Sequence, residues 1–146
     1  MGTTNKLRGI IPPMVTPLKE IDLLDMEGLD RLIDHILAGE VTGLFILGTT
    51  GEFSSLSYRL RYELVEEVCK LVNGKVPVLV GITDTSIIES IRLANHAKDQ
   101  GAEAVVAAPP YYYATGQPEL LEYYRNLLKM LPLPLYLITC RYTPKS

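Results

Sequence analysis

The sequence predicts an α/β fold in which parallel β-strands alternate with α-helices. Five short apolar runs recur along the chain, and they start about 30 residues apart, which is the length of one strand–helix unit. Most runs are apolar at successive positions, as is typical of parallel strands that are covered on both faces. The runs cover residues 8–17, 43–48, 76–83, 102–110 and 133–138.

Helical patterns fill the segments between these runs. The first helix starts near Met26 and is expected to end at Gly39, and Ser57 is a suitable N-cap for the second. Ser86 and Glu89 form a capping box at the start of the third helix, and Pro118 suits the first residue of the fourth. In the fourth helix we expect six apolar residues to face inward: Leu120, Leu121, Tyr124, Leu127, Leu128 and Leu131.

This alternation predicts a parallel sheet with helices outside it, in one domain that spans residues 1–146. Two architectures remain open, namely a doubly wound open sheet and part of a (βα)8 barrel. No glycine-rich G-x-G-x-x-G fingerprint follows the first run, which makes a dinucleotide-binding sheet less favoured.

The composition excludes several classes of function. The net charge is −3 and no basic stripe is present, so we expect no nucleic-acid partner. The two cysteines give neither a disulfide framework nor metal-ligand spacing. No apolar run approaches the roughly 18 residues of a membrane span, and no signal peptide is recognisable, so we expect a cytoplasmic protein without membrane contact.

Polar residues follow the second apolar run in the loop "LGTTGE". Gly48 allows the backbone to approach a ligand closely, and Thr49 and Thr50 place two hydroxyls and several N–H groups in one small turn. Such a loop can hold a carboxylate or phosphate oxygen, and a threonine hydroxyl can relay a proton. The alternative is a simple turn in which the threonines bond to their own backbone. We expect nearby backbone amides to hold the carboxylate of Glu52.

Tyrosines follow the fourth run in "PPYYYATG". A phenol held at a strand end can donate a hydrogen bond or pass a proton, whereas tyrosines are also common in contacts between subunits, and the two roles are compatible. After the third run, Asp84 and Thr85 could touch a substrate, but we favour a role in preparing the helix cap. We expect Thr16 and Pro17 to shape the rim of the barrel or sheet.

The segments "GLFILGTTGEFSSLS", "VPVLVGITDTS" and "AAPPYYYATGQPELLEYYRNL" resemble the dihydrodipicolinate synthase / N-acetylneuraminate lyase family. The resemblance extends from about Leu7 to Leu137. It implies a TIM (βα)8 barrel, of which this chain is the first half, truncated after the fifth strand. It also implies a class I aldolase that binds pyruvate or another 2-keto acid as a lysine Schiff base, with no cofactor and no metal.

The resemblance also implies roles for particular residues. Thr49 and Thr50, with Gly48 beside them, would hold the carboxylate of the keto acid, and Thr49 would relay a proton. Tyr112 would be the relay tyrosine that reaches toward a neighbouring subunit's site, with Tyr111 as the adjacent candidate. A homo-oligomer, either a dimer or a tetramer, is therefore expected.

The sequence departs from the family pattern in two respects. The segment "GITDTS" replaces the G-T-G-S-N-like loop of the synthases, which favours a sugar-acid or sialic acid aldolase. The Schiff-base lysine would lie beyond residue 146, since no lysine of this chain stands at the end of a matching strand. The alternative function is therefore a catalytically inactive half-barrel that binds a small carboxylate or associates with itself.

Residues 138–146 do not continue the pattern of the family, which has a Y-N-x-P motif here. Restoring a single base before codon 138 allows the reading Tyr-Asn-Met-Pro, so our hypothesis is a frameshifted, aberrant tail. An unrelated tail on a truncated chain is the alternative. The coding DNA distinguishes the two.

Overall fold

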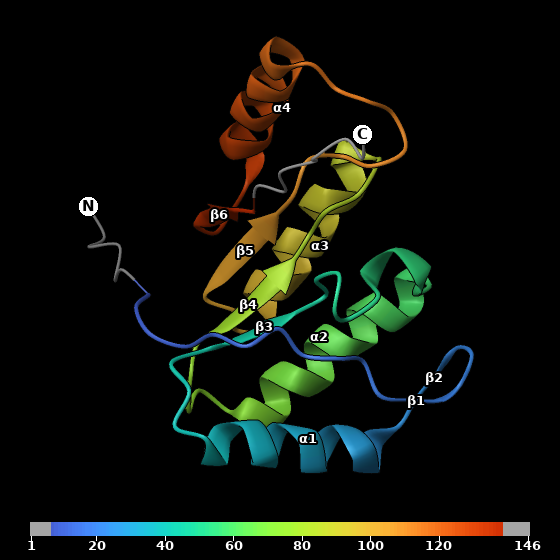
Figure 1. Cartoon of the computed structure of the whole chain (residues 1–146), viewed down its shortest axis with the longest axis vertical. Helices are drawn as coiled ribbons and strands as arrows, with labels where there is room; N and C mark the ends of the chain where they lie inside the picture. The colour runs from blue at the N-terminus through green and yellow to red at the C-terminus, as the bar shows by residue number, and fades with distance from the viewer. Residues whose placement is uncertain (1–6, 139–146) are drawn as a thin grey trace, which may run out of the picture.

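The computed structural model describes residues 7–138, so the expected aberrant tail lies outside the described residues from residue 139 onward. In chain order the elements are β1 (Leu18–Glu20), β2 (Leu23–Leu24), α1 (Met26–Ala38), β3 (Leu44–Ile46), the short 3-10 helix η1 (Phe53–Ser55), α2 (Tyr58–Val72), β4 (Val78–Gly81), α3 (Ile87–Asp99), β5 (Ala104–Ala107), α4 (Gln117–Met130) and β6 (Leu135–Leu137) (Figure 1). The predicted alternation of strands and helices is confirmed from α1 onward.

Strands β3, β4, β5 and β6 form one parallel sheet in chain order. Because strand–helix–strand crossovers are right-handed, a sheet that adds strands in one direction carries its helices on one face. Adjacent helices contact each other in sequence, and α2 and α3 contact β4 and β5. A doubly wound sheet reverses its strand order at a switch point, so this order is that of a barrel wall.

The first apolar run, residues 8–17, forms no regular strand, and this part of the prediction was wrong. The segment runs beside β3 and pairs with it at one bridge, between Pro13 and Phe45. Met14 N–H donates to the Phe45 carbonyl (2.8 Å), and Phe45 N–H donates to the Pro12 carbonyl (3.1 Å). Two successive prolines have no N–H to donate, so the ladder cannot extend.

A short antiparallel hairpin, β1–β2, precedes α1 and was not predicted. The turn between its strands carries Asp22, whose carboxylate accepts hydrogen bonds from Ser57 Oγ (2.6 Å) and Arg59 Nη2 (3.0 Å). These bonds attach the hairpin to the start of α2.

The predicted helix caps are largely confirmed. Ser57 Oγ accepts from Leu60 N–H (3.2 Å), and Ser86 Oγ accepts from Glu89 N–H (3.4 Å). The second half of the capping box is absent among the described residues, because the Glu89 carboxylate pairs with Arg92 (2.7 Å). Helix α1 ends at Ala38 with Gly39 as its C-cap, and α4 starts one residue before Pro118.

The apolar face predicted for α4 was partly wrong. Leu127 is fully buried, but Leu121 and Leu128 are 52% and 55% exposed. Among the described residues, the main contact of helix α4 with another element is with α3. Its apolar stripe is therefore wider than the surface that covers it.

The main core lies between the sheet and the helices. Leu29, Leu60, Leu64 and Ile46 are fully buried in it. The opposite face of the sheet carries a smaller cluster around Leu79, Ala104 and Val106. None of the helices within residues 7–138 has both the length and the hydropathy needed to cross a membrane.

Candidate functional site

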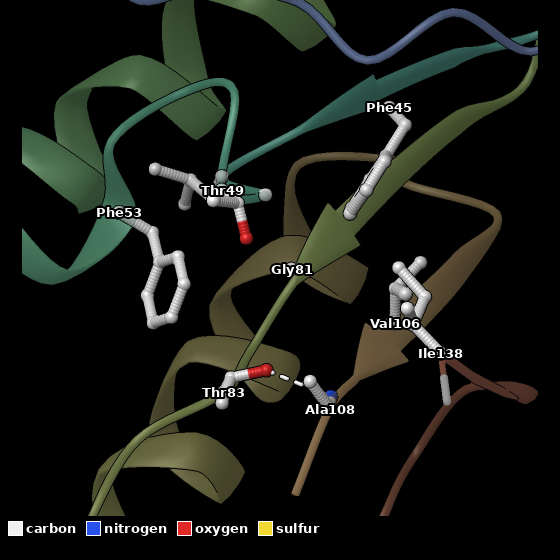
Figure 2. Close-up of a pocket in the computed structure, with 10 residues that line it drawn as sticks. Phe45, Thr49, Phe53, Gly81, Thr83, Val106, Ala108 and Ile138 are labelled. Atoms are coloured by element: carbon white, nitrogen blue, oxygen red, sulfur yellow. Dashed lines mark hydrogen bonds between the residues drawn. The ribbon is translucent and has the colours of Figure 1, made fainter. Parts of the chain in front are cut away.

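The loops that follow β3, β4 and β5 meet at the carboxyl edge of the sheet and enclose a small cavity of about 40 Å³ (Figure 2). Gly48 and Thr49 line it from the first loop, Gly81 and Thr83 from β4 and its loop, and Ala108 from the third. One water molecule takes about 30 Å³ of liquid volume, so this space matches a group of a few atoms. Ligand sites in parallel α/β folds gather at this edge.

The loop after β3 is held in place by its own backbone. Gly51 N–H donates to the Gly48 carbonyl (3.1 Å), and Glu52 N–H donates to the Thr49 carbonyl (3.0 Å). Thr16 Oγ1 donates to the Gly51 carbonyl (2.7 Å), which fixes the turn to the segment beside β3. The prediction that Thr16 shapes the rim is thereby confirmed.

Within residues 7–138, the N–H groups of Thr49 and Thr50 donate no hydrogen bond. Gly48 and Thr49 line the cavity, and Figure 2 shows the hydroxyl of Thr49 directed into it. Thr50 is exposed and lies outside the lining. The turn therefore offers one hydroxyl and two free amides to an anion.

Glu52 does not behave as predicted. Its side chain is exposed, and no backbone amide of the described residues donates to its carboxylate. Its backbone is left-handed, with a φ of 56°, as is that of Leu47, with a φ of 57°. Positive φ is unfavourable for such side chains, and conformations of this kind concentrate at functional sites.

Gly81 ends β4 directly under the loop after β3. A Cβ atom at this position would overlap the carbonyl oxygen of Leu47. The absence of a side chain lets the two backbones touch, and it leaves space for the cavity above β4.

Thr83 is a cavity-lining residue that the sequence analysis did not single out. It is buried, it lines the cavity, and its Oγ1 accepts a hydrogen bond from Ala108 N–H (2.9 Å) (Figure 2). The sequence could have indicated this position, because side chains alternate along a strand. Thr83 lies two residues beyond Gly81 and therefore on the same side of the chain.

Asp84 points away from this cavity and is also buried. Its Oδ1 accepts from Ser86 N–H (2.8 Å), which confirms the predicted role beside the helix cap. Its Oδ2 accepts from Arg61 Nη1 (3.2 Å) and from the Tyr58 hydroxyl (3.0 Å). Burial, together with the hydrogen bond to Asp84, raises the pKa of Tyr58. This buried cluster fixes the loop after β4 on the side opposite the cavity.

The tyrosine loop borders the cavity without filling it. The Tyr111 ring packs edge-on against Phe53, with 5.7 Å between ring centroids, and Phe53 lines the cavity. Tyr112 is 84% exposed with a φ of 83°, and its ring packs against Tyr113. The structure therefore brings Gly48 and Thr49 to the cavity, places Tyr111 at its border and turns Tyr112 outward.

The remaining lining is apolar. Phe45, Val106 and Ile138 lie on the side away from Phe53 (Figure 2). Hydroxyls and free amides in such surroundings bind an anionic oxygen more strongly than they would in water. Within the described residues, no group of histidine, cysteine and carboxylate side chains could hold a metal ion.

Comparison with known proteins gives a consistent result. The model of the dihydrodipicolinate synthetase family matches residues 6–142. A probable 2-dehydro-3-deoxy-D-pentonate aldolase, YjhH of Escherichia coli, is 38% identical over 132 residues, which are 90% of this chain and 44% of that protein. The chain thus spans less than half the length of the curated relatives that it matches.

Solved structures agree with this result. The dihydrodipicolinate synthase of Bacteroides thetaiotaomicron is 62% identical with a TM-score of 0.87, over 90% of this chain and 44% of that one. YagE of E. coli, solved in complex with pyruvate, is 36% identical with a TM-score of 0.84, over 88% and 43%. The four-stranded parallel sheet matches the N-terminal part of these barrels. This chain belongs to the dihydrodipicolinate synthetase family.

Proposed function

We propose that the chain binds the carboxylate of pyruvate or another 2-keto acid, and that it belongs to a lyase or aldolase that works through a lysine Schiff base. The observation that carries this proposal is the loop after β3. Its Thr49 hydroxyl faces the cavity, and the amides of Thr49 and Thr50 are free within residues 7–138. The pyruvate complex of YagE supports the choice of ligand.

The chemistry of a carboxylate suits these donors. Hydrogen bonds to an ionised group are roughly twice as strong as neutral ones, and backbone amides at a tight turn form a concave site for an anion. Gly48 lets the carboxylate approach the backbone closely. Thr50 contributes its amide in this arrangement, since its side chain lies outside the lining.

Schiff-base chemistry requires a lysine amine, which attacks the keto carbon with loss of water. The protonated imine then accepts the electron pair of the breaking carbon–carbon bond. None of the five lysines within residues 7–138 lines the cavity; they are Lys19, Lys70, Lys75, Lys98 and Lys129. We therefore propose that residues 7–138 hold the keto acid but supply no lysine to form the imine.

The tyrosines fit a relay between subunits. Tyr112 and Tyr113 are exposed in the loop after β5, and exposed tyrosines favour protein contacts. We propose that Tyr112 reaches the site of a second copy in a dimer or tetramer, while Thr49 passes a proton between tyrosines. We also propose a cytoplasmic location, where thiols such as that of Cys69 stay reduced.

A titration with ¹³C-labelled pyruvate, followed by borohydride treatment, tests the proposal. We expect saturable binding by the 146-residue chain, loss of binding in Thr49→Val, and unchanged binding in Thr42→Val, which lies before β3 at the end remote from the cavity. We expect no reduced adduct by mass spectrometry. Absence of binding would refute the anion site, whereas a stable adduct would refute the missing-lysine proposal.

A further inference from the structure

Thr83 has hydrogen-bonding capacity that the fold does not use. Its Oγ1 accepts from Ala108 N–H at 2.9 Å. A hydroxyl also has one proton to donate, and within residues 7–138 that proton has no acceptor. The residue is only 8% exposed, so bulk water gives little compensation.

The accepted bond limits where the hydroxyl proton can point. Because Ala108 N–H occupies one lone pair of Oγ1, the proton is directed away from the loop after β5. Thr83 and Thr49 line the same cavity from the ends of neighbouring strands, and Gly81 adds no side chain between them (Figure 2). The hydroxyl proton of Thr83 is therefore available to a ligand in the cavity.

The loop around Thr83 is rigid enough to act as a fixed donor. The next residue, Asp84, is held by Arg61, Tyr58 and the Ser86 amide. Ile82 N–H donates to the Val106 carbonyl at 2.9 Å. Thr83 is thus anchored on both sides along the chain.

We propose that Thr83 is a further ligand-binding residue, which donates its hydroxyl proton to the second carboxylate oxygen of the 2-keto acid. This inference rests on the function proposed above. A cavity of about 40 Å³ holds the carboxylate end of a keto acid and little more, so two hydroxyls from neighbouring strands flank the same group. The remainder of the ligand extends out of the cavity.

Titration of Thr83→Val and Thr83→Ser with pyruvate labelled at either C1 or C2 tests the inference. A hydrogen bond to a charged group is worth enough that Thr83→Val should weaken binding roughly 10- to 100-fold, while Thr83→Ser should remain close to wild type. The bound C1 shift should change in Thr83→Val far more than the C2 shift. A role confined to anchoring Ala108 would not move C1 selectively.

The outcomes separate this inference from the proposed function. If Thr49→Val loses pyruvate while Thr83→Val binds with wild-type affinity and an unchanged C1 shift, the role of Thr83 is refuted and the anion site stands. If the wild-type chain itself binds no pyruvate, both are refuted. Hydrogen exchange at the Ile82 amide, which donates to the Val106 carbonyl, confirms in each variant that β4 and β5 remain paired.

Discussion

Asp84→Asn is expected to lower the free energy of unfolding by about 3–5 kcal/mol, because it leaves a buried guanidinium without a counter-charge. The side chains of Arg61 and Asp84 are only 7% and 3% exposed, and Arg61 Nη1 lies 3.2 Å from Asp84 Oδ2. Removing one partner of such a pair costs more than removing both, since the remaining charge stays buried.

The magnitude follows from the bonds that the carboxylate accepts. Asp84 accepts from Arg61, from the Tyr58 hydroxyl and from the Ser86 amide. An asparagine keeps one acceptor oxygen, and its NH₂ group would face another donor. Arg61 also donates from Nε to the Leu56 carbonyl (3.2 Å), so it cannot swing out to water without losing a second bond.

Urea unfolding followed by circular dichroism measures the change. Arg61→Met should be similarly destabilising, whereas the double variant should be more stable than the sum of the two losses predicts, because no charge remains buried. Arg59→Met is the matched control, since Arg59 lies on the same helix in an exposed pair with Asp22 that water screens. Asp84→Asn within about 1 kcal/mol of wild type would refute the reasoning.

Three further outcomes are expected. Ser57→Ala removes the N-cap of α2 and should cost about 1 kcal/mol in urea unfolding, and an unchanged midpoint would contradict it. Burial raises the pKa of Cys69 to about 11, so its thiol is protonated at neutral pH. In a Cys140→Ser background, alkylation of Cys69 at pH 8 should be about 100-fold slower than alkylation of a free thiol. The rate should increase as the pH rises toward the pKa of Cys69. Gly81→Ala should abolish pyruvate binding and lower the melting temperature, because the new methyl group overlaps the Leu47 carbonyl; a variant that melts and binds normally would exclude the close contact.

The sequence predicted the elements that depend on local chemistry. Ser57 and Ser86 cap their helices as expected, because a cap involves residues only three positions apart. The parallel strands from β3 to β6 were recognisable as short apolar runs between helices. The first run failed because hydropathy does not register that Pro12 and Pro13 lack a donor.

Features that depend on long-range placement were not predictable in the same way. Thr83 and Asp84 are adjacent polar residues, and one faces the cavity while the other faces α2. Which of the two faces the cavity depends on where β4 ends, and a shift of one residue reverses the assignment. Leu121 and Leu128 satisfy a helical pattern, but their exposure depends on what packs beside α4.

The contact between Leu47 and Gly81 explains how the cavity is formed from such distant segments. Leu47 holds a φ of 57°, a conformation that costs about 1–3 kcal/mol for a residue with a side chain. This conformation turns its carbonyl onto β4 at the one position there without a Cβ, and the same turn carries Gly48 and Thr49 over the end of that strand. A relaxed residue at position 47 or a side chain at position 81 would move the loop outward, away from Thr83. The left-handed conformation of Leu47 and the missing side chain at Gly81 therefore depend on each other. Both are needed to hold the loop after β3 over the end of β4.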